Sequence, residues 1–471
     1  MLWDFAKFGN RPFATDDSGE IYRYDTLLRH GEAFADAVGE RCLIFILCTN
    51  SAGSILGYTA ALNHGIVPVL VDSGLERSLL HSLLDTYQPK YLWLPEKNAA
   101  EFPGYTAGYG EWGYTLLRAE SAPHCELYGD LALLLTTSGS TGSPKLVRQS
   151  YDNILANTES IVEYLHIDGD ERPITTLPMH YTYGLSVLNT HLFVGAEMIL
   201  TEHTLMQKEF WARVKDERVT SFAGVPYIYE MLNRLRFFRM DLPDLKTLTQ
   251  AGGKLSVELH EKFADFAAQT GKHFVVMYGQ TEATARMAYL PPEYAVRKRG
   301  SMGIAIPGGE FSLIDACGEP ITQPDTVGEL VYTGRNVTLG YAEQREDLAK
   351  GDERCGVLQT GDMAKVDSDG FYYIVGRKKR FLKVFGSRIN LDETERLVSS
   401  AFDGISCVCA GKDDHMYVFL TDDKLKEEVL KFLSQKTGFH PSAFTVCIID
   451  AIPRNESGKI VYQELAKYYE E

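Results

Sequence analysis

The chain has 471 residues, of which 45% are hydrophobic and 24% charged, and its formal net charge is −17. This composition is typical of a globular protein with room for one large and one small domain, and the negative charge disfavours binding to nucleic acid or to an anionic membrane surface. The sequence has no uncharged apolar run long enough to span a bilayer, and residues 1–10 lack the order of a signal peptide, so we expect a cytoplasmic protein without membrane insertion.

The first part of the chain alternates apolar runs with helix-like segments. Residues 41–49 form a continuous apolar run, followed by the helix-like residues 51–65 and a second apolar run at 66–71. This is the order of a strand, a crossover helix and a strand in a parallel sheet. The same theme predicts a helix at 153–164 before a strand at 174–177, and a helix at 257–270 before a strand at 273–277. The alternation predicts an α/β fold with helices covering both faces of the sheets.

From about residue 300 the pattern changes. Short strands separated by Gly and Pro are expected at 311–314, 328–333 and 371–375, which predicts a β-rich subdomain. Farther on, a helix at 425–437 and a strand at 444–450 predict a small C-terminal α+β domain. We therefore expect a large N-terminal domain over residues 1–378 and a small one over 379–471.

A loop of small hydroxylic residues and glycines follows the apolar run 131–135. It extends from Thr136 to Lys145 and reads TTSGSTGSPK. Its backbone N–H groups and hydroxyls can surround an anion such as phosphate, and Lys145 adds a point charge. The loop is not a Walker A motif, because Lys145 follows Pro144 and is not followed by Ser or Thr, so phosphotransfer by a P-loop kinase is disfavoured. A flexible surface turn is the alternative.

The TTSGSTGSPK loop resembles the phosphate-loop signature of the ANL superfamily, which comprises acyl-CoA synthetases, adenylation domains of peptide synthetases, and luciferases. Five further segments resemble that family's motifs in the same order: MYGQTEAT at 277–284, GEL at 328–330 with GY at 340–341, TGD at 360–362, the hinge segment 370–386, and PRNESGK at 453–459. The resemblance implies the ANL fold with a mobile C-terminal domain, and an enzyme that activates a carboxylic acid with ATP to form an acyl-adenylate.

The resemblance also implies roles for individual residues at the nucleotide. Glu282 organises Mg²⁺, a metal that prefers hard oxygen ligands, together with Thr141, and Thr281 lies near the α-phosphate. Asp362 accepts hydrogen bonds from the ribose hydroxyls, and Arg377 lends positive charge nearby. The other nucleotide-binding candidates are Thr137, Ser138, Gly139, Ser140, Gly142, Lys145, Gly252, Tyr278 and Gly279. The alternative for Glu282 is a solvated loop carboxylate, and for Tyr278 a core tyrosine.

Lys459 is the implied catalytic lysine. When the carboxylate of the acid attacks the α-phosphate two anions meet, and a cation between them stabilises the transition state. Lys379 matches the family's hinge position, where a backbone rotation withdraws Lys459 and brings the segment that begins at Lys383 over the site. An exposed terminal lysine is the alternative for Lys459, and a solvated basic run is the favoured interpretation for Lys378 and Arg380.

The segment 177–185 (LPMHYTYGL) resembles the family segment LPxxHxxGL that lines the acyl pocket. Tyr181 occupies the usual His position and His180 lies one residue earlier, so the resemblance supports no direct role for His180. An aromatic ring at Tyr181 suits an apolar or aryl acid. The sequence near Tyr183 has no acidic residue that could bind an α-amino group, which disfavours an amino-acid substrate. Further substrate-binding candidates are Tyr183, Gly224, Gly253, Gly279 and Lys383. For the glycines, packing is the alternative role.

The thiol acceptor is predicted to be CoA, because the chain has no fused carrier domain. Loading of the phosphopantetheine of a carrier protein is the alternative, and a nucleotide-binding ANL homologue without catalytic activity is a second one. The acid itself, the pathway and the oligomeric state are left open by the sequence.

Overall fold

The computed structural model describes residues 2–136, 145–378, 380–384, 387–402, 405–412, 415–437, 439–455 and 460–469. These residues form two compact units. The first unit comprises Met1–Glu310 and Thr333–Leu358, and the second comprises Phe311–Tyr332 and Gln359–Glu471. The domain boundary expected between residues 378 and 379 remains a prediction. Within the part of the chain that is described, no helix is both long and apolar enough to cross a bilayer.

The first unit contains an eight-stranded sheet with the order β18-β9-β8-β4-β3-β5-β7-β6. Its strands are β3 (Leu43–Cys48), β4 (Val67–Asp72), β5 (Tyr91–Pro95), β6 (Tyr105–Glu111), β7 (Tyr114–Ala119), β8 (Leu131–Thr136), β9 (Leu146–Ser150) and β18 (Gly340–Ala342). Strand β3 is buried along its whole length and pairs in parallel with β4 and β5. Continuous apolar runs are what a strand covered on both faces requires, so the predicted parallel arrangement is confirmed.

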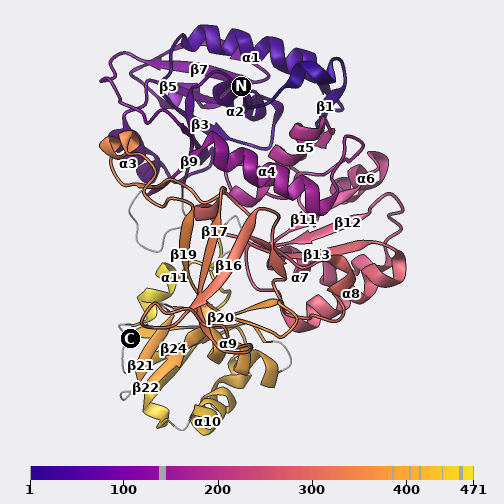
Figure 1. Ribbon diagram of the computed structural model, residues 1–471, viewed down its shortest axis with the longest axis vertical. Helices are drawn as coiled ribbons and strands as arrows, with labels where there is room; N and C mark the ends of the chain where they lie inside the picture. The colour runs from indigo at the N-terminus through magenta and orange to yellow at the C-terminus, as the bar shows by residue number, and fades with distance from the viewer. Residues whose placement is uncertain are drawn as a thin grey trace. The chain divides into compact units, whose positions relative to one another are not determined.

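Helix α2 (Ala52–Asn63) is the predicted crossover between β3 and β4. It begins after Ser51, whose side chain accepts a hydrogen bond from the backbone N–H of Ser54. The helix lies between α1 (Tyr24–Val38) and strands β3, β4 and β5, as Figure 1 shows. All its residues from Ala52 to Leu62 are buried, which explains why it is apolar on every side rather than amphipathic.

A second sheet of the first unit has five strands in the order β11-β12-β13-β14-β15. The strands are β11 (Ser221–Gly224), β12 (Thr247–Gln250), β13 (His273–Tyr278), β14 (Ala288–Tyr289) and β15 (Ile304–Ala305), and the first three run in parallel. Helix α8 (Val257–Thr270) precedes β13. The predicted helix at 257–270 and strand at 273–277 are confirmed. The other helices of the unit are α3 (Arg77–Tyr87), α4 (Tyr151–Leu165), α5 (Thr182–Val194), α6 (Lys208–Asp216) and α7 (Pro226–Arg234).

The strand predicted at 174–177 is wrong. Only isolated bridges form here, from Pro173 to Ser221 and from Ile174 to Ile199. Pro173 has no N–H to donate, and a second proline at Pro178 bounds the segment, so a ladder cannot extend across it. The nearby small sheet is formed instead by β10 (Met198–Ile199), β1 (Pro12–Thr15) and β2 (Ile21–Arg23).

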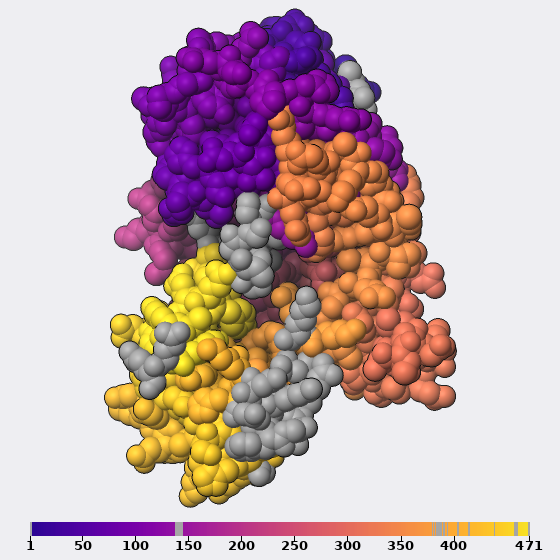
Figure 2. Space-filling view, turned by 90° about the vertical axis from the view of Figure 1, so that its left-hand side faces the viewer, coloured from indigo at the N-terminus to yellow at the C-terminus, as the bar shows by residue number. Residues whose placement is uncertain are grey.

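Residues 333–358 fold back onto the N-terminal part of the first unit, where they appear in orange against the purple surface in Figure 2. The hydroxyl of Tyr87 donates to the carbonyl of Ala342 at 2.8 Å. The guanidinium of Arg148 is fully buried and donates to the carbonyls of Tyr341 and Gly351 at 3.0 and 3.2 Å. These contacts bring the GY motif to the edge of the eight-stranded sheet, next to β9.

The second unit contains a four-stranded sheet of β16 (Gly309–Ile314), β17 (Gly328–Gly334), β19 (Val357–Val366) and β20 (Tyr372–Arg377). It confirms the predicted β-rich subdomain. The remaining strands are β21 (Phe381–Val384) and β22 (Ser387–Asn390), which form a hairpin, and β23 (Cys407–Lys412), β24 (His415–Leu420) and β25 (Phe444–Ile448). The helices are α9 (Leu391–Ala401), α10 (Lys426–Thr437) and α11 (Tyr462–Leu465). This mixture confirms the predicted α+β character of the C-terminal part.

Candidate functional site

The Gly/Ser/Thr loop joins two strands that are neighbours in the sheet. Strands β8 and β9 run antiparallel, and Thr136 pairs with Leu146. The loop between them is therefore a strand-to-strand connection, whereas a P-loop leads from a strand into a helix. The P-loop alternative is thus excluded by topology. The predicted phosphate-binding residues Thr137, Ser138, Gly139, Ser140, Thr141 and Gly142 lie outside the described residues.

Glu282 is held by contacts from three other residues of the first unit. It lies in a short 3-10 helix, Thr281–Ala283, that begins just after β13. The hydroxyl of Tyr341 donates to the Glu282 carboxylate at 2.7 Å. The Glu282 carbonyl accepts hydrogen bonds from the backbone and the hydroxyl of Thr338, at 3.0 and 2.9 Å, and from Arg354 at 3.0 Å. Both the position and the direction of the Glu282 carboxylate are therefore fixed.

Two cationic side chains contact the ring of Tyr341 beside Glu282. The ammonium of Lys145 lies 3.5 Å from the ring centroid, and the guanidinium carbon of Arg354 lies 4.6 Å from it. Lys145 is also 3.3 Å from the carboxylate of Glu343. Burial, together with the charge of Glu282, raises the pKa of Tyr341 to about 12, so its hydroxyl stays protonated and can donate at neutral pH. Neither Tyr341 nor Arg354 was assigned a role from the sequence.

The chain turns back sharply after Glu282. Thr284 adopts a φ of 66°, which is rare for a β-branched residue. Two hydrogen bonds stabilise this backbone conformation. The Thr284 hydroxyl donates to the carbonyl of Asn336 at 2.7 Å, and the Thr284 carbonyl accepts from the Thr182 hydroxyl. A Cβ atom at Gly279 would lie 1.7 Å from the carbonyl oxygen of Ala285, so only glycine permits this turn. Strain of this kind concentrates at functional sites.

The predicted acid-pocket tyrosines lie close to one another at the start of α5. Their ring centroids, those of Tyr181 and Tyr183, are 6.4 Å apart, with the rings nearly perpendicular. The Tyr183 hydroxyl is 2.9 Å from the hydroxyl of Thr249, and burial raises the pKa of Tyr183 to about 12. Burial also lowers the pKa of His180, so its imidazole is neutral at physiological pH. Tyr278, the adenine candidate, accepts a hydrogen bond from Gln280 at 3.2 Å.

The glycines predicted for the acid pocket and the nucleotide site have packing partners. A Cβ atom at Gly252 would lie 2.5 Å from the hydroxyl of Tyr181, one at Gly224 would lie 2.9 Å from Ile228, and one at Gly253 would lie 3.1 Å from Pro226. Glycine at these positions allows neighbouring side chains to approach the ends of β11 and β12. Contact of these glycines with a bound acid remains a prediction.

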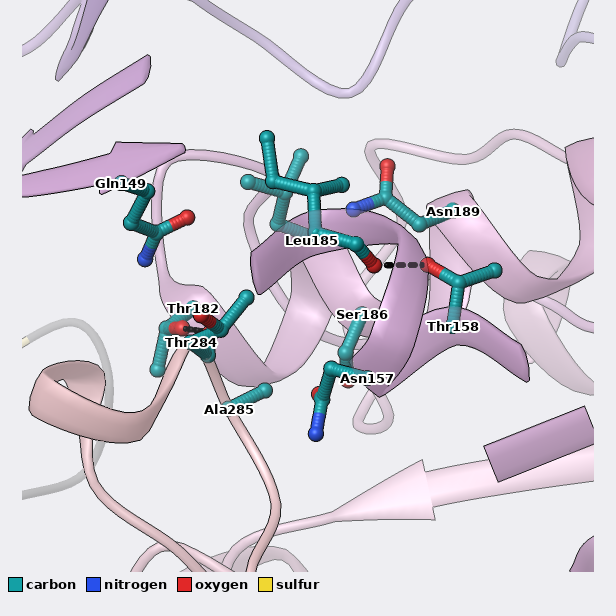
Figure 3. Close-up of a pocket in the computed structure, with 10 residues that line it drawn as sticks. Gln149, Asn157, Thr158, Thr182, Leu185, Ser186, Asn189, Thr284 and Ala285 are labelled. Carbon is teal, nitrogen blue, oxygen red and sulfur yellow. Dashed lines mark hydrogen bonds between the residues drawn. The ribbon is translucent and has the colours of Figure 1, made fainter. Parts of the chain in front are cut away.

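A small polar cavity lies behind the turn at Thr284, between α4 and α5 (Figure 3). Its volume is about 10 Å³, which suits roughly one water molecule. The side chains that Figure 3 draws around it include Gln149, Asn157, Thr158, Thr182, Ser186 and Asn189. This cavity is too small for an organic acid.

Asp362 and Arg377 are brought together in the second unit by the pairing of β19 with β20. They are direct partners in the antiparallel register, and their Oδ1 and Nε atoms are 3.4 Å apart. The Asp362 carboxylate is only 6% exposed, whereas the Arg377 side chain is 68% exposed. The next residue, Lys378, donates to the buried carboxylate of Glu329 at 2.6 Å, which gives the glutamate of the GEL motif a structural partner.

The expectation of a solvated Arg380 is wrong. Its side chain is only 16% exposed and forms ion pairs with Asp392 and with Glu395, the latter at 2.8 Å. It also donates to the Cys409 carbonyl at 2.6 Å, and its guanidinium lies 4.5 Å from the ring centroid of Tyr462. Asp392 and Glu395 lie 12 and 15 residues after Arg380 in the sequence. The run of basic residues around Arg380 therefore could not predict these ion pairs.

The next three predicted residues, Lys379, Lys383 and Lys459, belong to the C-terminal part of the chain. Lys379 and Lys459 lie outside the described residues, and so does the side chain of Lys383. The backbone of Lys383 pairs with Arg388 across the β21–β22 hairpin. Arg454 pairs with Ile460, so the residues on either side of the segment 456–459 are joined by a bridge.

The motif order and this geometry agree with a comparison against protein families. A family model described as AMP-binding enzyme matches residues 3–342. The chain belongs to the AMP-binding enzyme family. The ANL membership expected from the six motifs is thereby confirmed.

Two curated relatives show how far the likeness of this AMP-binding enzyme extends. A feruloyl-CoA synthase from Amycolatopsis sp. is 28% identical over 351 residues, which are 72% of this chain and 70% of the relative. A 2-succinylbenzoate–CoA ligase from Bacillus pumilus is 26% identical over 448 residues, which are 92% of this chain and 87% of the relative.

A solved structure shows that the fold of the AMP-binding enzyme is shared. The o-succinylbenzoate CoA synthetase from Bacillus subtilis, in complex with its acyl-adenylate intermediate, aligns with a TM-score of 0.78 and 21% identity. The alignment covers 98% of this chain and 97% of that chain. At this level of identity the likeness establishes the ANL fold, and the predicted fold class is confirmed.

Proposed function

We propose that the chain activates a carboxylic acid with ATP and transfers the acyl group to CoA. The observation that carries this proposal is the cluster around Glu282, in which Tyr341 fixes the carboxylate while Lys145 and Arg354 supply positive charge. The names of the relatives, which are CoA ligases, support the same reaction class.

In the first half-reaction a carboxylate oxygen of the acid attacks the α-phosphorus of ATP, and pyrophosphate leaves. Lys145 and the loop at 137–142 would bind the departing phosphates, and Thr281 would contact the α-phosphate. Asp362 would accept from the ribose hydroxyls, with Arg377 as its cationic partner. Lys459 would lie between the two approaching anions. In the second half-reaction the CoA sulfur attacks the acyl carbon and AMP leaves.

Mg²⁺ is an expected companion of ATP, and Glu282 is the residue that fits it. Mg²⁺ keeps several waters and is usually held by one or two carboxylates together with substrate phosphates. A single carboxylate whose direction is fixed by Tyr341 meets this requirement. When bound, the ion neutralises charge on the phosphates. Thr141 stays a predicted second oxygen donor.

One experiment identifies both the acid and the thiol acceptor. The protein is incubated with ATP, Mg²⁺ and a broad panel of acids, first for pyrophosphate release and then with either CoA or a phosphopantetheinylated carrier protein. We expect an acyl-CoA product. Thioester on the carrier alone would overturn the CoA assignment and support the carrier alternative. Absence of pyrophosphate release with every acid would favour a nucleotide-binding homologue without catalysis. A cytoplasmic location remains a prediction.

Tyr341→Phe tests the cluster around Glu282. The variant keeps the ring between Lys145 and Arg354 but removes the hydroxyl that donates to Glu282. Loss of a hydrogen bond to a charged group predicts a fall of about tenfold in acid-dependent pyrophosphate exchange, and we expect a higher Mg²⁺ concentration for half-maximal rate. Tyr109→Phe is the matched control, since its hydroxyl donates to the His30 carbonyl at 3.3 Å in the same unit. Equal rates for both variants would contradict the prediction.

A further inference from the structure

Arg286 is a buried cation with no anionic partner in the described part of the chain. It follows the turn at Thr284 and is only 3% exposed. Its Nη1 atom lies 3.3 Å from the Tyr164 hydroxyl and 3.2 Å from the sulfur of Met277. Its guanidinium carbon lies 5.1 Å from the ring centroid of Tyr183. Among the described residues, no carboxylate forms an ion pair with it.

The unpaired state of this guanidinium is costly. Arginine cannot lose its proton at physiological pH, and a buried charge is normally paired because desolvation alone costs several kcal/mol. On the edge formed by Nε and Nη2, the Nε atom is buried and makes no hydrogen bond to any described residue. That edge is the fork that binds both oxygens of a carboxylate. Within the described residues, Arg286 therefore has the geometry to bind a carboxylate and has none bound to it.

Arg286 is held rigidly at this place. The side chain of Asn157 donates to the Arg286 carbonyl at 2.8 Å, and that of Asn336 donates to the same oxygen at 3.1 Å. Asn157 and the neighbouring Ala285 are drawn in Figure 3, where both lie at the same end of the small polar cavity. These hydrogen bonds fix the backbone of Arg286, and the contacts of Nη1 with Tyr164 and Met277 fix one edge of its side chain, so little further entropy is lost when a ligand arrives.

Arg286 lines a second cavity, with a volume of about 30 Å³. The other lining residues include Val187, Thr190, His191, Ala223 and Thr249. Ala223 and Thr249 lie at the ends of β11 and β12, beside the predicted acid pocket, and the Tyr183 hydroxyl is 2.9 Å from that of Thr249. The cavity is thus adjacent to where the acid is expected, and its volume suits a small group such as a carboxylate.

His191 adds a second unpartnered polar atom to this cavity. His191 is 4% exposed, its Nδ1 atom lies 2.7 Å from the Val187 carbonyl, and its Nε2 atom has no partner among the residues that the structure describes. Burial, together with the charge of Arg286, lowers the pKa of His191 to about 4. Glu171 also lines the cavity, but its carboxylate accepts from the Thr220 hydroxyl. An anion placed beside Arg286 would also offset the positive charge felt by His191.

We propose that Arg286 binds a second carboxylate, carried at the far end of the acid, so that the substrates are dicarboxylic acids. This inference rests on the proposed function, because it assumes that one carboxylate of the acid is activated by ATP. The other carboxylate accepts hydrogen bonds from the Nε and Nη2 edge of Arg286 and replaces the missing counter-charge. Tyr181 and Tyr183 lie beside the spacer between the two groups.

The test compares acids that differ only in the second carboxylate: butanoate with succinate, hexanoate with adipate, and benzoate with phthalate. Acid-dependent pyrophosphate exchange is measured for the wild-type protein and for Arg286→Met. We expect the wild type to favour the dicarboxylic member of at least one pair. In Arg286→Met, kcat/KM for that dicarboxylic acid should fall by about tenfold to a hundredfold, while the rate with its monocarboxylic partner changes little.

The controls separate the failure of this inference from that of the proposed function. Arg286→Lys keeps the charge and should show an intermediate preference, and Arg218→Met removes an exposed arginine paired with Asp244 and should leave the preference unchanged. The wild-type preference needs no variant, so it decides the question even if Arg286→Met does not fold. Equal or better exchange with the monocarboxylic acids would overturn the dicarboxylate assignment alone. No exchange with any acid would overturn the proposed function and this inference with it.

Discussion

Lys459→Ala is expected to reduce acid-dependent pyrophosphate exchange by about two to three orders of magnitude. The physical reason is the approach of the acid's carboxylate to the α-phosphate of ATP, which brings two anions into contact. Removal of one preorganised charge that stabilises such a transition state costs on the order of 10² to 10³ in rate. The thioester-forming step is expected to be affected much less, because the attacking group there is not a carboxylate.

The two half-reactions are measured separately to test this. Exchange reports acyl-adenylate formation, and supplying a chemically prepared acyl-adenylate with CoA reports the second step. Lys431→Ala, an exposed lysine on α10, is the matched control and should keep both rates. Equal losses in the two half-reactions of Lys459→Ala would contradict a role confined to the first.

Arg380→Ala is expected to lower the free energy of unfolding of the second unit by about 2 to 3 kcal/mol, because it leaves two partly buried carboxylates without their cation. The affected carboxylates are those of Asp392 and Glu395. Burial already raises the pKa of Glu395, and without Arg380 that pKa rises further. Since protonation removes the buried charge, the loss of stability should be largest above that raised pKa and shrink as the pH falls through it.

Hydrogen exchange of the backbone amides of β23 and β24 measures this loss within the second unit, where a global unfolding curve of a protein with two units is not two-state. The matched control is Arg396→Ala, because this exposed arginine on α9 donates to the Val375 carbonyl at 2.6 Å. It should cost about 1 kcal/mol or less. A loss of similar size in both variants would contradict a special role for Arg380.

Local sequence patterns predicted the fold well wherever apolar runs were continuous. The run at 41–49 became β3, and the helix at 257–270 has the same limits in the structure. The pattern failed at 174–177, where four apolar or β-compatible residues lie between two prolines. No strand forms at 174–177 because the flanking prolines lack backbone N–H groups. The hydropathy of the side chains carries no information about this loss of hydrogen bonding.

The site was predictable only in so far as it lies in contiguous motifs. Glu282, Asp362 and Arg377 were found because each belongs to a recognisable motif, and the pairing of β19 with β20 shows why the last two act together. The contact of Tyr341 with Glu282 joins residues separated by 59 positions, and no local pattern reports such a pair. The burial of Arg286 was equally hidden, since a lone arginine after a turn suggests an exposed side chain.

The residues on either side of position 379 are attached to different parts of the second unit. On one side, the backbone N–H of Lys378 donates to the Gly361 carbonyl at 2.8 Å, and its side chain binds Glu329 on the four-stranded sheet. On the other side, Arg380 is bound to the α9 and β23 layer. If residue 379 is the hinge, its own torsion angles are the part of this segment that can rotate without breaking either attachment.

Such a rotation would break hydrogen bonds between β20 and α9. Between β20 and α9, the Arg377 N–H donates to Asp392 at 3.0 Å and Arg396 donates to the Val375 carbonyl at 2.6 Å. Each contributes on the order of 1 kcal/mol, so separating the two elements there costs about 2 kcal/mol. Because 1.4 kcal/mol corresponds to a factor of about ten, a ligand that binds one arrangement about thirtyfold better than the other is enough to make the two arrangements about equally populated.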